Sequence, residues 1–204
     1  MTSVLIDATV LGRAGGDRGT GTYVRELLRE LGRRDDLTVS ALWPRSVASP
    51  PGVRPVEVER ANTGRFQFVE HGLRLPIELI RTDSEVFHGP SATPPPRCRR
   101  GWVETIFDVI PLTHADADLA NERRRWHRIG GRFRRADAII ATSSHTASEA
   151  IRVLGIDPSK VYVAHLAAGR SFAPPPDLTP TGRSTFLFVG GIEQRKRISD
   201  AMGV

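Results

Sequence analysis

The feature that most constrains this 204-residue chain is the alternation of short apolar runs with longer segments of helical spacing. Runs of strand type occupy residues 4–8, 37–43, 56–58, 85–88, 102–107, 138–141 and 161–164. Helical spacing occurs in residues 22–34, 67–80 and 117–136. A further helix is expected to start at a capping box of Thr146 and Glu149 and to end at Gly155. Strands that alternate with helices form a parallel sheet covered on both faces. The sequence therefore predicts an α/β fold with a doubly wound, mostly parallel, Rossmann-like sheet.

A glycine-rich stretch follows the first predicted strand. Ligands of such folds bind beyond the carboxyl ends of the strands, and exposed N–H groups at a helix N-terminus suit a phosphate or another anion. The dinucleotide pattern G-x-G-x-x-G is not met, because Val24 occupies its third glycine position counted from Gly19. Gly19, Thr20 and Gly21 are candidate substrate-binding residues, and an ordinary strand-to-helix turn is the alternative.

Two further candidates lie at the ends of predicted strands. His88 ends one strand before Gly89 and Pro90, where either a functional or a purely structural histidine is expected. Asp108 ends the next strand, and its carboxylate is expected to hold a sugar hydroxyl, to act as a base or to cap the following turn. We expect His88, Asp108 and residues 19–21 to converge on one cleft.

Composition limits the classes of partner and cofactor. The net charge of +6 comes almost wholly from arginine, with Lys160 and Lys196 the two lysines, and no nucleic-acid motif accompanies it. Nucleic acid is therefore not expected as a partner. Cys98 is the one cysteine, which excludes an internal disulfide and a cysteine-rich metal site. The N-terminus reads as a strand and no run is long enough to span a membrane, so a cytoplasmic location is expected.

The end of the chain reads like the start of a second unit. A proline-rich linker at residues 174–180 predicts a boundary between a domain at 1–180 and a short piece at 181–204. In that piece an apolar run at 186–189 is of strand type, and Gly190 and Gly191 provide a turn. The cations of Arg195 and Lys196 follow, where a solvated face is the alternative to a diphosphate site.

Taken in order, these stretches resemble the family-4-type (group 1) glycosyltransferases, which have the two-domain GT-B fold. The matching stretches are "GDRGTGTYVRELLREL", "VFHGP", "ADAIIATSSHTASEAIRVLGIDPSKVYVAHLAAGRSFAP" and "FLFVGGIEQRKRISDAM". They correspond to the acceptor-side loop, a D-x-x-H strand end, the close of the N-terminal domain and the first strand of the donor-binding domain. The resemblance covers nearly the whole chain and implies the N-terminal half of a GT-B fold plus the beginning of its partner.

The resemblance also implies a reaction. The complete enzyme would transfer a sugar from a nucleotide diphosphate donor to a hydroxyl acceptor, a glycan or a lipid-linked group, with retention and without an obligatory metal or other cofactor. Residues 19–21 would line the cleft, His88 and Asp108 would lie near acceptor or sugar, and Arg195 and Lys196 would meet the donor diphosphate.

Two departures from the family pattern bear on activity. Phe107 stands where the family commonly has histidine, and phenylalanine neither accepts a proton nor donates a hydrogen bond. The glutamate-bearing donor domain does not follow Val204 in this sequence. The chain alone is therefore expected to be inactive. A non-catalytic sugar- or anion-binding protein is the alternative, and a nicotinamide-binding Rossmann domain is a third interpretation.

Seven arginines crowd the helix predicted at residues 117–136. Leu119, Trp126, Ile129 and Phe133 form its apolar stripe, and the arginines fill most of the remaining surface. Two interpretations are open for these cations: contact with an anionic membrane at its inner face, or a solvated surface on a helix packed against the sheet.

Overall fold

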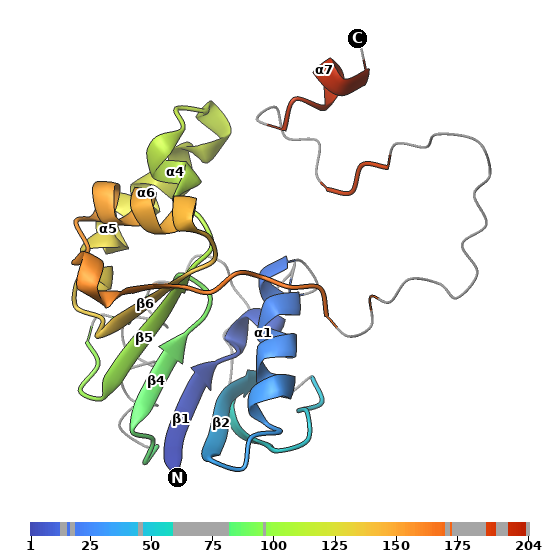
Figure 1. Ribbon diagram of the computed structural model, residues 1–204, viewed down its shortest axis with the longest axis vertical. Helices are drawn as coiled ribbons and strands as arrows, with labels where there is room; N and C mark the ends of the chain where they lie inside the picture. The colour runs from blue at the N-terminus through green and yellow to red at the C-terminus, as the bar shows by residue number, and fades with distance from the viewer. Residues whose placement is uncertain are drawn as a thin grey trace, which may run out of the picture.

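The computed structural model describes residues 1–12, 16, 19–44, 47–58, 82–95, 97–169, 172, 187–190 and 196–202. Within these ranges seven strands form one all-parallel sheet in the order β3-β2-β1-β4-β5-β6-β7 (Figure 1). The strands are β1 (Thr2–Asp7), β2 (Leu37–Pro44), β3 (Val53–Val58), β4 (Val86–Gly89), β5 (Gly101–Ile106), β6 (Ala138–Ala141) and β7 (Val161–Val163). The predicted Rossmann-like α/β fold is confirmed.

All the described helices except α7, which follows β7, fall between these strands, as the alternation predicts. The α-helices are α1 (Gly19–Leu31), α4 (Ile110–Thr113), α5 (Ala120–Phe133), α6 (Ser144–Leu154) and α7 (Ile198–Met202). Single 3-10 turns occur at η1 (Thr9–Gly12), η3 (Ala117–Leu119) and η4 (Pro158–Lys160). The one helix predicted at 117–136 is thus a 3-10 turn followed by α5. No described helix is both long and apolar enough to cross a membrane.

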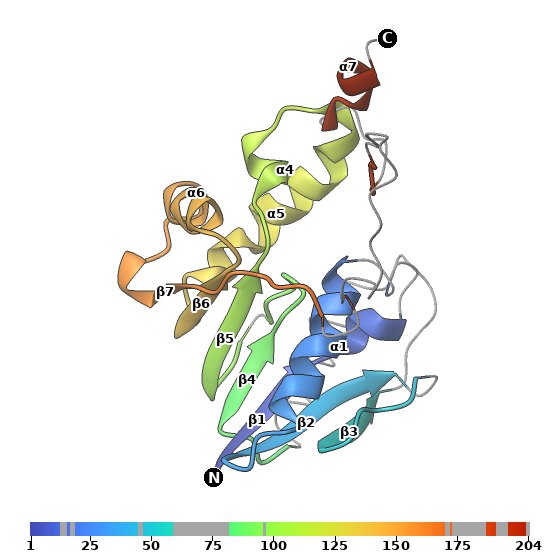
Figure 2. The same ribbon diagram turned by 45° about the vertical axis from the view of Figure 1, so that its right-hand side comes forward.

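Alternate residues of the strands face two separate hydrophobic clusters. Ile6 and Ala41 pack with Val24 and Leu28 of α1. Leu5, next to Ile6 on β1, belongs instead to the cluster built around α5 and α6. Because successive side chains of a strand point to opposite faces, α1 covers one face of the sheet and α5 and α6 cover the other. Figure 2 shows α1 in front of β1 and β2.

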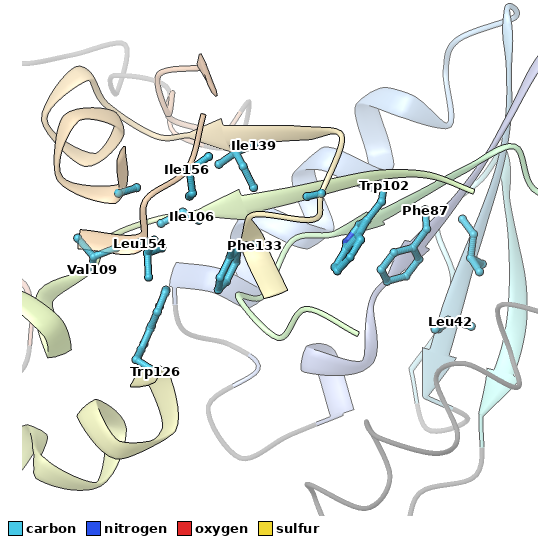
Figure 3. Close-up of a cluster of buried hydrophobic side chains, with 13 residues drawn as sticks. Leu42, Phe87, Trp102, Ile106, Val109, Trp126, Phe133, Ile139, Leu154 and Ile156 are labelled. Atoms are coloured by element: carbon cyan, nitrogen blue, oxygen red, sulfur yellow. The ribbon is translucent and has the colours of Figure 1, made fainter. Parts of the chain in front are cut away.

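The larger cluster fixes α5 on the sheet. The buried stripe of α5 is formed by Trp126, Ile129 and Phe133, as the helical spacing predicts. The Trp126 and Phe133 rings are stacked with their centroids 5.3 Å apart. They join Phe87 and Trp102 of the central strands in the same core (Figure 3). Burial of these large aromatic side chains is the main force that holds the helix on its face.

The strand order contains a reversal that determines where a ligand can bind. From β1 the chain builds outward through β2 to β3, and it then returns to place β4 on the other side of β1. From β4 it continues outward to β7. In open parallel sheets the crevice outside such a switch point, at the carboxyl ends of the strands, is the usual binding site. Here that point lies between β1 and β4, whose register pairs Ile6 with His88.

The predicted start of α6 is wrong, and its predicted end is confirmed. The sequence predicts a capping box of Thr146 and Glu149, whereas Ser143 is the N-cap, its hydroxyl oxygen accepting a hydrogen bond from the Thr146 amide at 3.0 Å. Glu149 pairs with Arg152 one turn further on. Ser143 prevails because it has the extended backbone of an N-cap, which Thr146, inside the helix, lacks. Gly155 ends the helix with φ of +63°, as predicted.

Other boundaries differ in smaller ways. Helix α1 begins three residues before the predicted Thr22, within the glycine-rich stretch. Strand β3 extends back to Val53 and includes Pro55, which an edge strand tolerates because one of its sides has no ladder to complete.

Residues 187–189 are not in a strand, although their composition predicts one. A strand forms only where a neighbouring strand completes its backbone hydrogen bonds, and an apolar run does not by itself provide that neighbour. The predicted helix at 67–80 and the linker at 174–180 lie outside the described residues.

Candidate functional site

The carboxyl ends of β1, β4 and β5 are neighbours in the sheet and carry the predicted site residues. Asp7 ends β1, His88 and Gly89 end β4, and Phe107 and Asp108 follow β5. Helix α1, which starts at Gly19, covers the face on which the His88 side chain lies beside Ile6. The structure therefore brings residues from four segments to one edge of the sheet, and their convergence on a single cleft stays a prediction.

His88 is buried and bonded within the protein. Only 6% of its surface is exposed, and its Nε2 atom lies 2.8 Å from the Thr105 hydroxyl oxygen on β5. Burial lowers the pKa of His88 from 6.5 to about 4, because an imidazolium would lose its hydration without gaining a compensating charge. At neutral pH His88 is therefore a neutral imidazole that links β4 to β5. The sequence left a functional and a structural role open for His88, and its hydrogen bond to Thr105 is a structural one.

Tyr23 extends the same link to α1. Its hydroxyl lies 3.5 Å from the Thr105 hydroxyl, and its ring meets the Phe107 ring edge-on, with centroids 5.0 Å apart. Sequence reasoning missed both Tyr23 and Thr105. Tyr23 could have been found from its position one helical turn after the glycines. Thr105 could not, because its contact with His88 depends on which strands are adjacent, and a single sequence does not give the strand order.

Phe107 and Asp108 are held by local hydrogen bonds. The Phe107 carbonyl accepts hydrogen bonds from the hydroxyls of Thr142 and Thr146, each at 3.0 Å. The exposed Asp108 accepts one from the Ile110 amide at 3.0 Å through Oδ1. Asp108 thus caps the turn that opens α4, which is one of its three predicted roles. The same carboxylate stays at the edge of the sheet in an exposed position.

The glycine-rich stretch is tightly packed at one position and open at another. A Cβ atom on Gly21 would lie 1.7 Å from the Gly16 carbonyl oxygen, whereas a Cβ atom on Gly19 would have no atom of the described residues within 4 Å. Arg25 also donates to the Gly16 carbonyl at 3.1 Å. Glycine at 21 is therefore required for the close approach of the loop to the helix, and Gly19 leaves the N-terminus of α1 exposed.

A buried carboxyl group lies behind this edge, on the opposite face of the sheet. Glu104 is fully buried, and its Oε1 accepts a hydrogen bond from the Trp102 indole at 2.7 Å, while its Oε2 has no hydrogen-bond partner among the residues that the structure describes. Burial raises the pKa of Glu104 well above its ordinary value, and the charge of the nearby Asp7 raises it further. A Cβ atom on Gly89 would lie 2.3 Å from Oε1, so glycine at 89 leaves room for this side chain. No sequence pattern indicated it.

The predicted diphosphate site is described only in part. Arg195 lies outside the described residues. Lys196 is exposed, and its Nζ lies 2.9 Å from the position of a Cβ atom on Gly190. In the part of the chain that the structure covers, no three His, Cys, Asp or Glu side chains gather closely enough to hold a metal ion.

The packing of the glycine-rich stretch leads to a matched pair of substitutions. Gly21→Ala should destabilise the protein by about 1–3 kcal/mol, because the methyl group forces the loop away from α1. Gly19→Ala should leave the free energy of unfolding unchanged or raise it by up to about 1 kcal/mol, since alanine favours the helix and meets no atom. Urea unfolding followed by circular dichroism measures both. Equal effects of the two substitutions would contradict the packing described here.

A family model and several solved structures match the chain. The family model described as Glycosyltransferase Family 4 matches residues 18–167. Solved structures similar to the chain include Anabaena HepE in complex with UDP (15% identity, TM-score 0.44) and with UDP and glucose (14%, 0.46), each covering 81% of this chain. A glycosyltransferase from Rickettsia africae ESF-5 shows 14% identity and a TM-score of 0.42 over 89% of this chain. No curated protein matches the sequence.

The chain spans less than half the length of these solved structures: 44% of each HepE chain and 47% of the Rickettsia enzyme. The family match covers 150 of 204 residues and includes the start of α1, His88, Thr105 and Asp108. The chain therefore belongs to Glycosyltransferase Family 4.

Proposed function

We propose that this chain forms the acceptor side of a glycosyltransferase that moves a sugar from a nucleoside diphosphate donor to a hydroxyl acceptor with retention. Family membership over residues 18–167 carries the proposal, because that range contains every candidate of the N-terminal domain. The meeting of α1, β4 and β5 at the switch point supports it.

In this proposal the exposed groups of the edge meet the substrate and the buried ones hold them in place. The carboxylate of Asp108 accepts a hydrogen bond from an acceptor or sugar hydroxyl, and the exposed N–H groups at the start of α1 bind an anionic or hydroxyl oxygen. His88 and Thr105 fix the strands behind them. Arg195 and Lys196 neutralise the leaving diphosphate, a step that needs no metal.

A non-catalytic sugar-binding protein with the same edge is the second candidate, and Phe107 favours it. The ring of Phe107 packs against Tyr23 and supplies no proton-transferring group at the end of β5. Both candidates predict that a sugar binds at this edge. They differ in turnover, for which donor and acceptor must be held together in one site.

Sugar binding is tested by titrating the ¹⁵N-labelled chain with methyl glycosides and recording amide chemical shifts. We expect perturbations at residues 19–23, 88–91 and 105–108. NADH, the ligand of the nicotinamide interpretation, should leave these residues unperturbed. Shifts caused by NADH and not by any glycoside would overturn the proposal.

Two aspartates provide a matched pair of variants for this titration. Asp108 caps Ile110 at the carboxyl edge, and Asp157 caps Ser159 in the same way at 2.9 Å, before β7 at the amino edge. Asparagine retains the cap but removes the charge. Asp108→Asn should weaken glycoside binding about tenfold, the usual contribution of a hydrogen bond to a charged group, and Asp157→Asn should not change it. Equal affinities of the two variants would exclude a binding role for Asp108.

A contact with anionic lipid belongs to the same proposal, because it would bring the protein to a lipid-linked acceptor. Arg128 and Arg135 are exposed on or just after α5 and support it. In vesicle co-sedimentation, more protein should pellet with anionic than with neutral lipid, and Arg128→Gln should reduce the difference. Equal pelleting with both lipids would refute the contact.

A further inference from the structure

Three of the arginines of α5 do not face solvent as a charged surface but donate hydrogen bonds to loop backbone. Arg123 donates through Nε to the Pro111 carbonyl at 2.9 Å, and through Nη2 to the carbonyls of His114 and of Asp116, the latter at 3.2 Å. These carbonyls belong to the loop that follows Asp108 and contains α4. One side chain thus satisfies three backbone acceptors just after the candidate site residue.

The other two arginines reach the loop after β4. Arg125 donates to the Ala92 carbonyl at 3.0 Å, and Arg132 donates to the Pro94 carbonyl at 3.1 Å. Ala92 has φ of +49°, a left-handed conformation that is unfavourable for a residue with a side chain. The hydrogen bond to its carbonyl therefore helps to hold this loop, which begins two residues after His88, in a conformation that it would not prefer alone.

The helical geometry explains how one helix reaches both loops. At 100° per residue Arg125 and Arg132 lie about 20° apart around α5, whereas Arg123 lies roughly 160° from Arg125 and roughly 180° from Arg132. The two loops therefore flank the helix. The helix itself is fixed by its buried stripe, in which Trp126 and Phe133 are at most 5% exposed. A loop bonded to α5 is thus bonded to a rigid support.

We propose that Arg123, Arg125 and Arg132 form an arginine clamp that positions the loops after β4 and β5 for substrate binding. Asp108 accepts a hydrogen bond from the Ile110 amide at the start of α4. Arg123 donates to one carbonyl within α4 and to two carbonyls after it. Arginine is needed because a planar guanidinium offers five N–H donors in several directions, whereas a lysine ammonium is one point of charge. Together the three arginines donate to five backbone carbonyls of the two loops. The effect of the clamp on substrate binding rests on the proposed function. Its effect on the conformation of the two loops does not.

Amide hydrogen exchange on the whole chain tests the clamp directly. The reporters are the amides of Leu112 and His114, which donate to the carbonyls of Val109 and Ile110 within α4. Arg123→Gln should speed their exchange about tenfold, because the turn loses the support of its carbonyls. Arg124→Gln is the matched control. Its guanidinium bonds within α5, to Asn121 at 3.0 Å, and its removal should change neither reporter.

Three comparisons separate positioning from general stability. The unfolding midpoint and the amide exchange of α5 should be the same in Arg123→Gln and Arg124→Gln. Arg123→Lys should restore only part of the exchange protection of Leu112 and His114. Glycoside affinity should fall about fivefold or more in Arg123→Gln alone. Unchanged exchange at Leu112 and His114 would overturn the clamp, and faster exchange with unchanged affinity would overturn its positioning role. If the wild-type chain binds no glycoside, the proposed function fails and the exchange comparison alone decides the clamp.

Discussion

The hydrogen bond between His88 and Thr105 joins the two strands on which the candidate site is built. It lies next to the switch point of the sheet, where β4 returns beside β1. Tyr23 links α1 to the same hydroxyl, so the helix after the glycines and the two strands share one polar contact inside an otherwise apolar face. A buried hydrogen bond of this kind is costly to break, because either partner alone would be left unsatisfied. The positions of Gly19, Phe107 and Asp108 relative to one another follow from it.

Hydrophobic spacing was enough to predict most of the fold. The stripe of Trp126, Ile129 and Phe133 predicts the buried face of α5, and the apolar run at 138–141 predicts β6 with the bounds observed. Gly155 predicts the end of α6 because a left-handed residue is needed there. The N-cap of α6 was assigned to the wrong residue, since two serines and two threonines lie close together and only backbone conformation distinguishes Ser143 as the cap.

The site was harder to predict because its contacts join segments far apart in the chain. The sequence indicates His88 and Asp108 through their places after strands, but not that Thr105 is the partner of His88, seventeen residues away. The burial of Glu104 against Gly89 depends likewise on the register between β4 and β5. The arginines of α5 were interpreted as surface charge, whereas Arg123, Arg125 and Arg132 donate to loop carbonyls. The arginines of α5 thus differ in their surroundings: some are exposed, and others hold loop backbone.

The central claim is that His88 is a neutral, buried link between β4 and β5. Because folding lowers its pKa, the imidazole contributes stability that is present above about pH 6.5 and is lost as the pH falls through about 4. The most direct measurement follows the imidazole ¹⁵N resonances of His88 by NMR between pH 8 and pH 3.5. The account predicts that His88 stays neutral until the pH approaches 4. A midpoint near 6.5, the value of an unperturbed imidazole, would contradict it.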